Sequence, residues 1–200
     1  MRANRHGAHQ RNRGQSLVEF AISSMVLILL LMGLLDLSRA FYYSVNIQGA
    51  AREGARHGAW FDTASRSNKY LYDDAVMLAV RQAMAGSGFD GTNLPLPTQV
   101  KSASCLSPAD GNFFNNKPYA VAAAPPATGQ VYVYICYTYP GGGMQTGTMP
   151  TAPLDSAWRL GDINVSIVMN FALITPFIQN MFGKGIPLVY NEHFTIQGQP

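Results

Sequence analysis

The first part of the chain changes abruptly from polar to apolar. Residues 1–14 are rich in arginine and contain no acid, and the stretch Leu17–Leu35 is almost entirely apolar apart from Glu19 and a few small residues. Its nineteen residues would extend about 28 Å as a helix, close to the roughly 30 Å thickness of a bilayer's hydrocarbon core. The pattern therefore predicts a membrane-spanning helix at residues 15–37, preceded by a basic leader at residues 1–14.

Apolar and small residues continue at roughly helical spacing past the predicted span, at Leu37, Phe41, Val45, Ala51, Ala55 and Ala59. We therefore expect one helix from about Ser16 to about Ala59, with residues 38–60 as an amphipathic continuation outside the membrane. The alternative is a cleavable secretory signal that ends at Ala40, but the apolar run of such signals is usually about 7–15 residues long. The continued helical spacing favours retention of the helix.

The remaining residues, 61–200, have the pattern of a small α+β domain. A helix is predicted from Asn68, as its N-cap, to about Ala85, with Gly86 as its stop. One face of this helix would carry Leu71, Ala75, Leu78 and Ala79. Alternation predicts strands at Gln130–Tyr139, Asp162–Ile174 and Ile186–Ile196, with a loop at Pro140–Pro153 and a short helix at Phe177–Phe182. The expected fold is α+β, with a long N-terminal helix packed on a small antiparallel sheet.

Charged residues are scarce and unevenly distributed. They make up 12% of the chain, about half of the roughly 25% in typical soluble domains, and hydrophobic residues make up 48%. Four of the 14 Lys and Arg side chains precede Gly14, so the remainder carries 10 basic and 11 acidic residues, a net charge of −1. Because nucleic-acid binding needs a basic face on the folded part, no nucleic-acid partner is expected. The arginines instead predict a cytoplasmic N-terminus.

Glu19 lies inside the apolar run, where a charge costs about 2.5–3.5 kcal/mol at the bilayer centre on insertion scales. Snorkelling to the nearby interface is one solution. A second depends on the spacing from Gly14: a cut after this glycine would make Gln15 the new N-terminus. Its α-amino group, with a reference pKa of about 8, would be largely cationic and able to pair with Glu19 of an adjacent subunit.

Small residues form two rows on the outer half of the predicted helix. The predicted packing surface consists of Ala50, Ala51, Gly54, Ala55 and Gly58. Small side chains let another backbone approach closely, and Gly54 and Gly58 fit the small-xxx-small packing pattern. The partner of this surface is either another subunit or the chain's own domain.

Together these segments resemble a known family. The leader RNRG, followed by QSLVEF and an apolar helix, looks like the class III signal of type IV pilins, which a prepilin peptidase cuts after glycine. The stretch Asp36–Ala59, which includes AAREGAR, resembles the TadE-like minor pilins, or pseudopilins, of the tight-adherence (Tad/Flp) pilus system. Ile163–Leu188 is similar to the closing part of that family. The chain's length, and Phe20 where major Flp pilins usually have tyrosine, favour a minor subunit.

The resemblance implies a pilin-like fold with a structural role in pilus assembly and surface adhesion, and no catalysis by the chain itself. Gly14 and Gln15 would form the processing site, and Glu19 would set the register with a neighbouring subunit. The expected partners are the membrane, a prepilin peptidase, other minor and major pilins and the inner-membrane assembly platform. The expected location is the bacterial cytoplasmic membrane, crossed once, with residues 61–200 outside the cytoplasm. The alternatives are an anchored domain that is never cleaved, and a secreted binding domain or enzyme released after Ala40.

Candidate catalytic and metal-binding residues are sparse. The histidines, at positions 6, 9, 57 and 193, have no metal-ligand spacing, and there is no P-loop or nucleophile elbow. We therefore expect no metal, cofactor or small-molecule substrate. Asp73 and Asp74 are adjacent and would diverge on a helix, which favours an N-terminal dipole role over an acid/base pair. Cys105 and Cys136 fit one disulfide outside the cytoplasm, and two unrelated buried thiols are the alternative.

Overall fold

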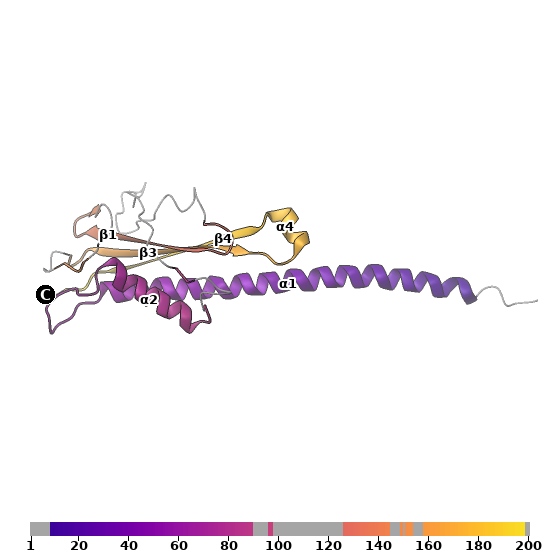
Figure 1. Cartoon of the computed structure of the whole chain (residues 1–200), viewed down its shortest axis with the longest axis horizontal. Coiled ribbons are helices and arrows are strands. Elements are labelled where there is room, and N and C mark those ends of the chain that lie inside the picture. Colours follow the sequence, from indigo (N-terminus) through magenta and orange to yellow (C-terminus); the bar gives the residue numbers. More distant parts are fainter. Residues whose placement is uncertain are drawn as a thin grey trace, which may run out of the picture.

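The computed structural model of the protein describes residues 9–89, 96–97, 126–144, 149, 151–153 and 158–198, and for residues 9–13, 144 and 182 it describes the backbone alone. Its longest element is the helix α1 (His9–Ala59), whose 51 residues correspond to about 76 Å. The C-terminal half of α1 packs on the folded domain, and the N-terminal half projects away from it (Figure 1). The helix ends at Ala59 as predicted but begins earlier than Ser16.

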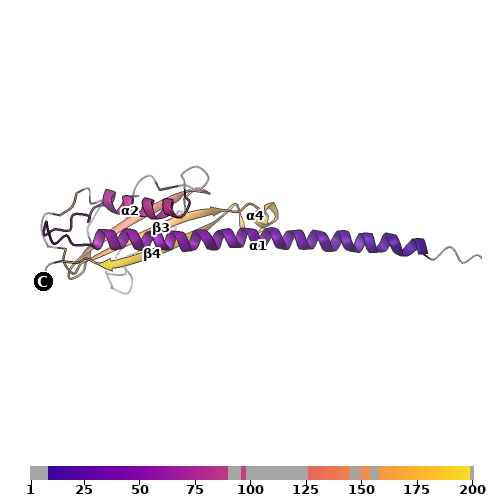
Figure 2. The same ribbon diagram turned by 90° about the horizontal axis from the view of Figure 1, so that it is seen from below.

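The folded domain has an antiparallel sheet with the strand order β2-β1-β3-β4 in the described residues. The strands are β1 (Val131–Tyr139), β2 (Gly143–Met144), β3 (Asp162–Ala172) and β4 (Gly185–Thr195). In β3, Val165 is paired with Ile135 of β1 and with Glu192 of β4. The helix α1 lies along this sheet, and α2 (Asp73–Gly86) packs beside α1 (Figure 2). This arrangement confirms the predicted α+β fold.

The three predicted strands and the short helix are confirmed to within two residues at each end. The short helix is α4 (Pro176–Phe182), which connects β3 to β4. The strand β2, only two residues long, lies inside the stretch predicted as a loop, where the backbone turns back on β1 to pair Thr138 with Met144. Glycines 141 and 142 in this turn have φ angles of 95° and 93°, a conformation that residues with a Cβ rarely adopt.

The predicted start of the second helix was wrong. Its N-cap is Tyr72, and Asn68 lies four residues earlier in a loop. The Asn68 side chain is fully buried and donates from Nδ2 to the carbonyl of Gln197 at 2.8 Å, so it joins this loop to the C-terminal segment. The predicted face was partly wrong as well: Leu71, Ala75 and Ala79 are buried, but Leu78 is 56% exposed.

The buried face of α1 also differs from the predicted one. The outer half is buried at Tyr43, Ile47, Ala50, Ala51, Ala55 and Ala59, whereas Leu37, Phe41 and Val45 are exposed. The predicted row jumps six residues from Val45 to Ala51. Six residues turn an α-helix by about 240°, so these two side chains point to different sides. Leu37, Phe41 and Val45 therefore belong to an exposed face and not to the core of the domain.

Candidate functional site

Gly14, Gln15 and Glu19 lie in the projecting half of α1, outside the folded domain. All three are exposed, and the Gln15 side chain donates from Nε2 to Oε1 of Glu19 at 3.0 Å. A Cβ built at Gly14 meets nothing within 4 Å. The three residues are thus accessible to other molecules on a continuous helix. Their roles in processing and assembly stay predictions.

The helix that follows Glu19 is apolar and uncovered. This apolar part of α1 is long and apolar enough to cross a membrane. None of its most apolar 18 residues is buried in the domain. Large side chains such as Leu27, Leu30 and Leu34 are each more than half exposed. Exposed apolar surface on this scale is unfavourable in water. The projecting half of α1 therefore has the length and composition of a membrane anchor, and it is the one such helix in the part of the chain that the structure describes.

The predicted helix-packing surface is buried against the chain's own domain. Its members Ala50, Ala51, Gly54, Ala55 and Gly58 are all buried. A Cβ at Gly54 would lie 2.5 Å from Cγ2 of Val80, and one at Gly58 would lie 2.8 Å from Cγ2 of Val76 and still closer to Ile163. The small residues therefore allow α2 and β3 to approach α1 closely. Of the two partners considered, the structure places the chain's own domain on this surface.

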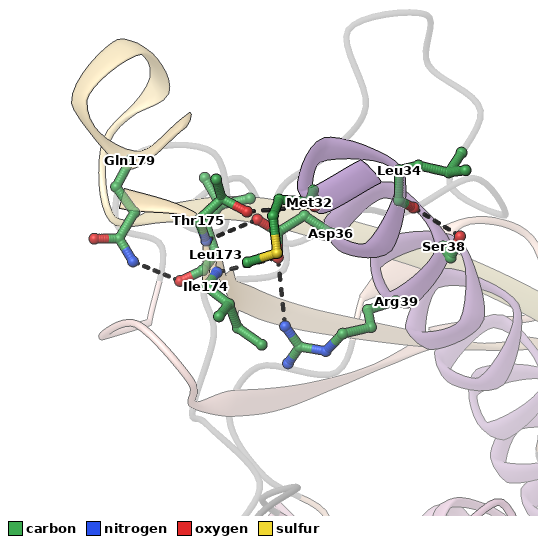
Figure 3. Close-up of polar contacts among 9 residues, drawn as sticks. All are labelled: Met32, Leu34, Asp36, Ser38, Arg39, Leu173, Ile174, Thr175 and Gln179. Atoms are coloured by element: carbon green, nitrogen blue, oxygen red, sulfur yellow. Dashed lines mark hydrogen bonds and ion pairs between the residues drawn. The ribbon is translucent and has the colours of Figure 1, made fainter. Parts of the chain in front are cut away.

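Asp36 joins the end of the apolar helix to the far end of the chain (Figure 3). Its side chain lies between α1 and the segment after β3, and the residue is 3% exposed. Oδ1 accepts the backbone N–H of Ile174 at 3.1 Å, and Oδ2 accepts that of Thr175 at 2.9 Å. Arg39 lies 3.5 Å from Oδ1, and the Thr175 hydroxyl donates to the carbonyl of Met32 at 3.3 Å. One carboxylate therefore accepts two backbone N–H groups and forms an ion pair with Arg39.

The local sequence patterns did not predict this junction. The local signals were present: an acid directly after an apolar run, and a Thr-Pro break after an alternating strand. Nothing local links them, because the two sites are 139 residues apart.

The helix α4 continues the junction. Gln179 donates from Nε2 to the carbonyl of Leu173 at 2.7 Å, and its backbone N–H donates to the carbonyl of Thr175 at 3.0 Å. A Cβ built at Gly33 would lie 3.5 Å from Cδ1 of Ile178, so α4 packs directly on the last turns of the apolar segment. The junction therefore consists of α1 around residues 32–39 and the chain from Leu173 to Phe182.

Asp73 and Asp74 do not form an acid/base pair. Asp73 is buried and accepts the hydroxyl of Tyr137 at 2.8 Å and the backbone N–H of Met149 at 3.1 Å, whereas Asp74 is exposed. Burial raises the pKa of the Asp73 carboxyl, and the hydrogen bond from Tyr137 partly opposes this shift. Asp73 therefore fastens the start of α2 to β1.

Asp162, a buried acid at the start of β3, contacts a histidine. Its Oδ1 and Oδ2 both lie 3.3 Å from Nδ1 of His193, which is half exposed on β4. Burial raises the pKa of Asp162 to about 6, and the charge of His193 opposes the shift. Within the part of the chain that the structure describes, no three His, Cys, Asp or Glu side chains gather closely enough to hold a metal ion.

The predicted disulfide lies partly outside the described residues. Cys136 is buried in β1, opposite Asn164 of β3, but Cys105 belongs to a stretch that the structure does not describe. The Cys105–Cys136 pairing stays a prediction.

Comparison with known proteins finds a family that the N-terminal part of the chain resembles. Residues 14–56 match the model of the TadE family, described as TadE-like protein. No curated protein and no solved structure matches the chain. The match contains Gly14, Glu19, Asp36 and the AAREGAR stretch, and it ends before the folded domain, so the resemblance of Ile163–Leu188 stays a prediction. The match confirms that the helix of this chain, from Gly14 to Arg56, is similar to that of the TadE-like proteins.

Proposed function

We propose that this chain is a membrane-inserted minor pilin of a tight-adherence pilus system, with a structural rather than a catalytic role. The observation that carries the proposal is the division of α1 into an uncovered apolar half that begins at Gly14 and a half built into the domain. An uncovered apolar helix needs lipid or the helices of other subunits around it. A filament subunit uses both in turn, first in the membrane and then in the helix bundle of the pilus.

In this proposal the chain has four functional segments. Residues 1–14 are a cytoplasmic leader, residues 15–37 span the membrane, residues 38–60 continue the helix, and residues 61–200 form the domain outside the cytoplasm. A prepilin peptidase cuts between Gly14 and Gln15. Glu19 then neutralises the new amino group of a neighbouring subunit, and the domain contributes to initiation, capping or surface contact of the pilus.

The contacts of Asp36 support retention of the helix over its release as a signal peptide. A cut after Ala40 would remove Asp36 and leave the backbone N–H groups of Ile174 and Thr175 without their acceptor. A cut beside Gly14, where the helix is exposed and free of the domain, removes none of these contacts.

The N-terminal residue of the mature protein tests the proposal. Mass spectrometry of the protein purified from cells should find Gln15 at the N-terminus. Met1 would instead indicate an uncleaved anchor, and Phe41 a secreted domain, and either result contradicts the pilin proposal.

A pair of glycine variants tests the processing site. Gly14→Val should block cleavage, because a branched side chain beside the scissile bond hinders the peptidase. Gly49→Val makes the same change at another exposed helical glycine with nothing within 4 Å of its Cβ, and it should be processed normally. Normal processing of Gly14→Val would remove Gly14 from the recognition site.

A further inference from the structure

We propose that α4 and the residues beside it, Ile174–Lys184, form a second membrane contact that inserts into the interface of the leaflet facing the folded domain. The proposal rests on the membrane insertion of α1 under the proposed function. It adds a lipid-binding role for a segment that begins 138 residues after Asp36 in the sequence. We call Ile174–Lys184 the α4 segment.

The position of the α4 segment along α1 supports the proposal. The α4 segment contacts α1 at Met32, Gly33 and Asp36, in the last turns of the apolar run that ends at Leu35. These are the residues at which α1 leaves the hydrocarbon core if Leu17–Leu35 fills it. Figure 1 shows α4 at the end of the domain nearest the projecting half of α1. A helix fixed at this level lies in the interfacial layer, because the membrane surrounds α1 on all sides.

The outer surface of the α4 segment is apolar. Ile174 and Phe177 are each 56% exposed, and Met181 is 65% exposed. Phe177 and Met181 are four residues apart and therefore share one face of the helix. The sequence of α4, PFIQNMF, contains no charge, and the exposed Lys184 follows directly. An uncharged helix with an apolar outer face and a flanking lysine is typical of segments that lie in a membrane interface.

Several backbone groups of the α4 segment have partners inside the protein. Asp36 accepts the N–H groups of Ile174 and Thr175, Gln179 covers the carbonyls of Leu173 and Thr175, and Pro176 has no N–H. Polar backbone groups must be satisfied internally where water is scarce. A loop in water has no such need, so this pattern favours burial of the segment in lipid.

Lipid is favoured over another protein as the partner of the exposed face of the α4 segment. A protein partner would have to reach a surface that lies at the level of the bilayer, whereas interfacial lipid is already there. Lys184 adds a cation at the position of the lipid phosphates, and α4 itself offers a protein partner no charge to pair with.

Tryptophan quenching by brominated lipids tests the proposal in the full-length chain, reconstituted in vesicles at a high lipid-to-protein ratio. The added tryptophan is Phe177→Trp. The natural tryptophans serve as internal controls, because Trp60 is 27 residues beyond Gly33, about 40 Å along α1, and Trp158 stacks on Tyr139 at the same far end. Leu30→Trp reports the span itself, and Leu160→Trp an exposed site on the far end of the domain.

The fluorescence added by Phe177→Trp should be lost with lipids brominated near the headgroup and less affected by lipids brominated near the chain end. Leu30→Trp should be quenched, and Leu160→Trp should not. Quenching at position 30 without quenching at position 177 would overturn the inference and leave the membrane anchor intact. Quenching at neither position would contradict membrane insertion itself.

Two further measurements separate lipid contact from a protein contact and from loss of folding. If position 177 is protected from lipid in proportion to the protein density in the vesicles, a second copy covers α4 and the inference fails. Phe177→Ser with Met181→Ser should weaken the binding of α4 to the interface, seen as a rise in its proteolytic cleavage, while the circular dichroism of the domain is unchanged. Unchanged cleavage in this variant would also contradict the inference.

Discussion

The carboxylate of Asp36 accepts the backbone N–H of Thr175 at 2.9 Å and thereby fixes the last turn of the apolar helix to the end of β3. The adjacent N–H of Ile174 donates to the other oxygen of the same carboxylate. This contact adds a second attachment between α1 and the domain, beyond the buried face of its outer half from Tyr43 to Ala59.

Removal of this carboxylate should destabilise the domain. Asp36→Ala leaves the buried N–H of Thr175 and the partly buried N–H of Ile174 without an acceptor. It should lower the free energy of unfolding by about 1–3 kcal/mol, measured with urea on the full chain in detergent. The amide protons of Ile174 and Thr175 should exchange faster. Asp36→Asn keeps one acceptor oxygen and should lose less.

Ser38→Ala is the matched control for Asp36. The Ser38 hydroxyl donates to the carbonyl of Leu34 at 2.7 Å within the same helix, on an exposed face. Its loss should leave the stability and the exchange of Thr175 unchanged. Equal exchange rates in Asp36→Ala and Ser38→Ala would show that Asp36 does not hold the junction.

The glycines of α1 should respond to alanine in opposite directions. Gly58→Ala would force a Cβ against Val76 and Ile163 and should lower the free energy of unfolding by about 1–3 kcal/mol through overpacking. Gly49→Ala adds a Cβ in open space and should raise it by about 0.5–1 kcal/mol through helix propensity. Thermal unfolding of the two variants measures the difference, and equal effects would contradict the close packing of α1 on α2.

Asp162 should make the domain less stable as the pH rises from about 4 to 7. Its folded pKa of about 6 exceeds the ordinary value of 3.8, so the unfolded state ionises first and is stabilised relative to the native state as the pH rises. The full shift corresponds to about 3 kcal/mol at most. The stability of Asp162→Asn, which cannot ionise, should fall less over this range, and parallel pH profiles of the two proteins would refute the shift.

Glu19→Ala should be processed normally but impair pilus assembly, because the new N-terminus of a neighbour loses its counter-charge. Glu53→Ala is the control, because Glu53 lies on the same helix and pairs with Arg56 of its own chain at 2.5 Å. Electron microscopy of the cell surface measures pili in both strains. Normal pili in Glu19→Ala would remove the role proposed for this residue.

The sequence by itself determined the elements and their kinds. The span, the long helix to Ala59, the strands around Val133, Val165 and Val189, and the spacing of Gly14 from Glu19 are all local patterns. Each depends on residues within a few turns of one another, so periodicity and composition are enough to find them. The match to the TadE-like proteins lies in the same locally patterned part of the chain.

Only the tertiary structure decided which faces are buried and which distant residues meet. The role of Asn68 depends on a carbonyl 129 residues away, and that of Asp36 on N–H groups 138 and 139 residues away. Periodicity cannot report such pairs, because they form only when the helix and the sheet pack together. The same packing places α4 beside Gly33. It therefore also determines where the surface lies that we propose contacts lipid.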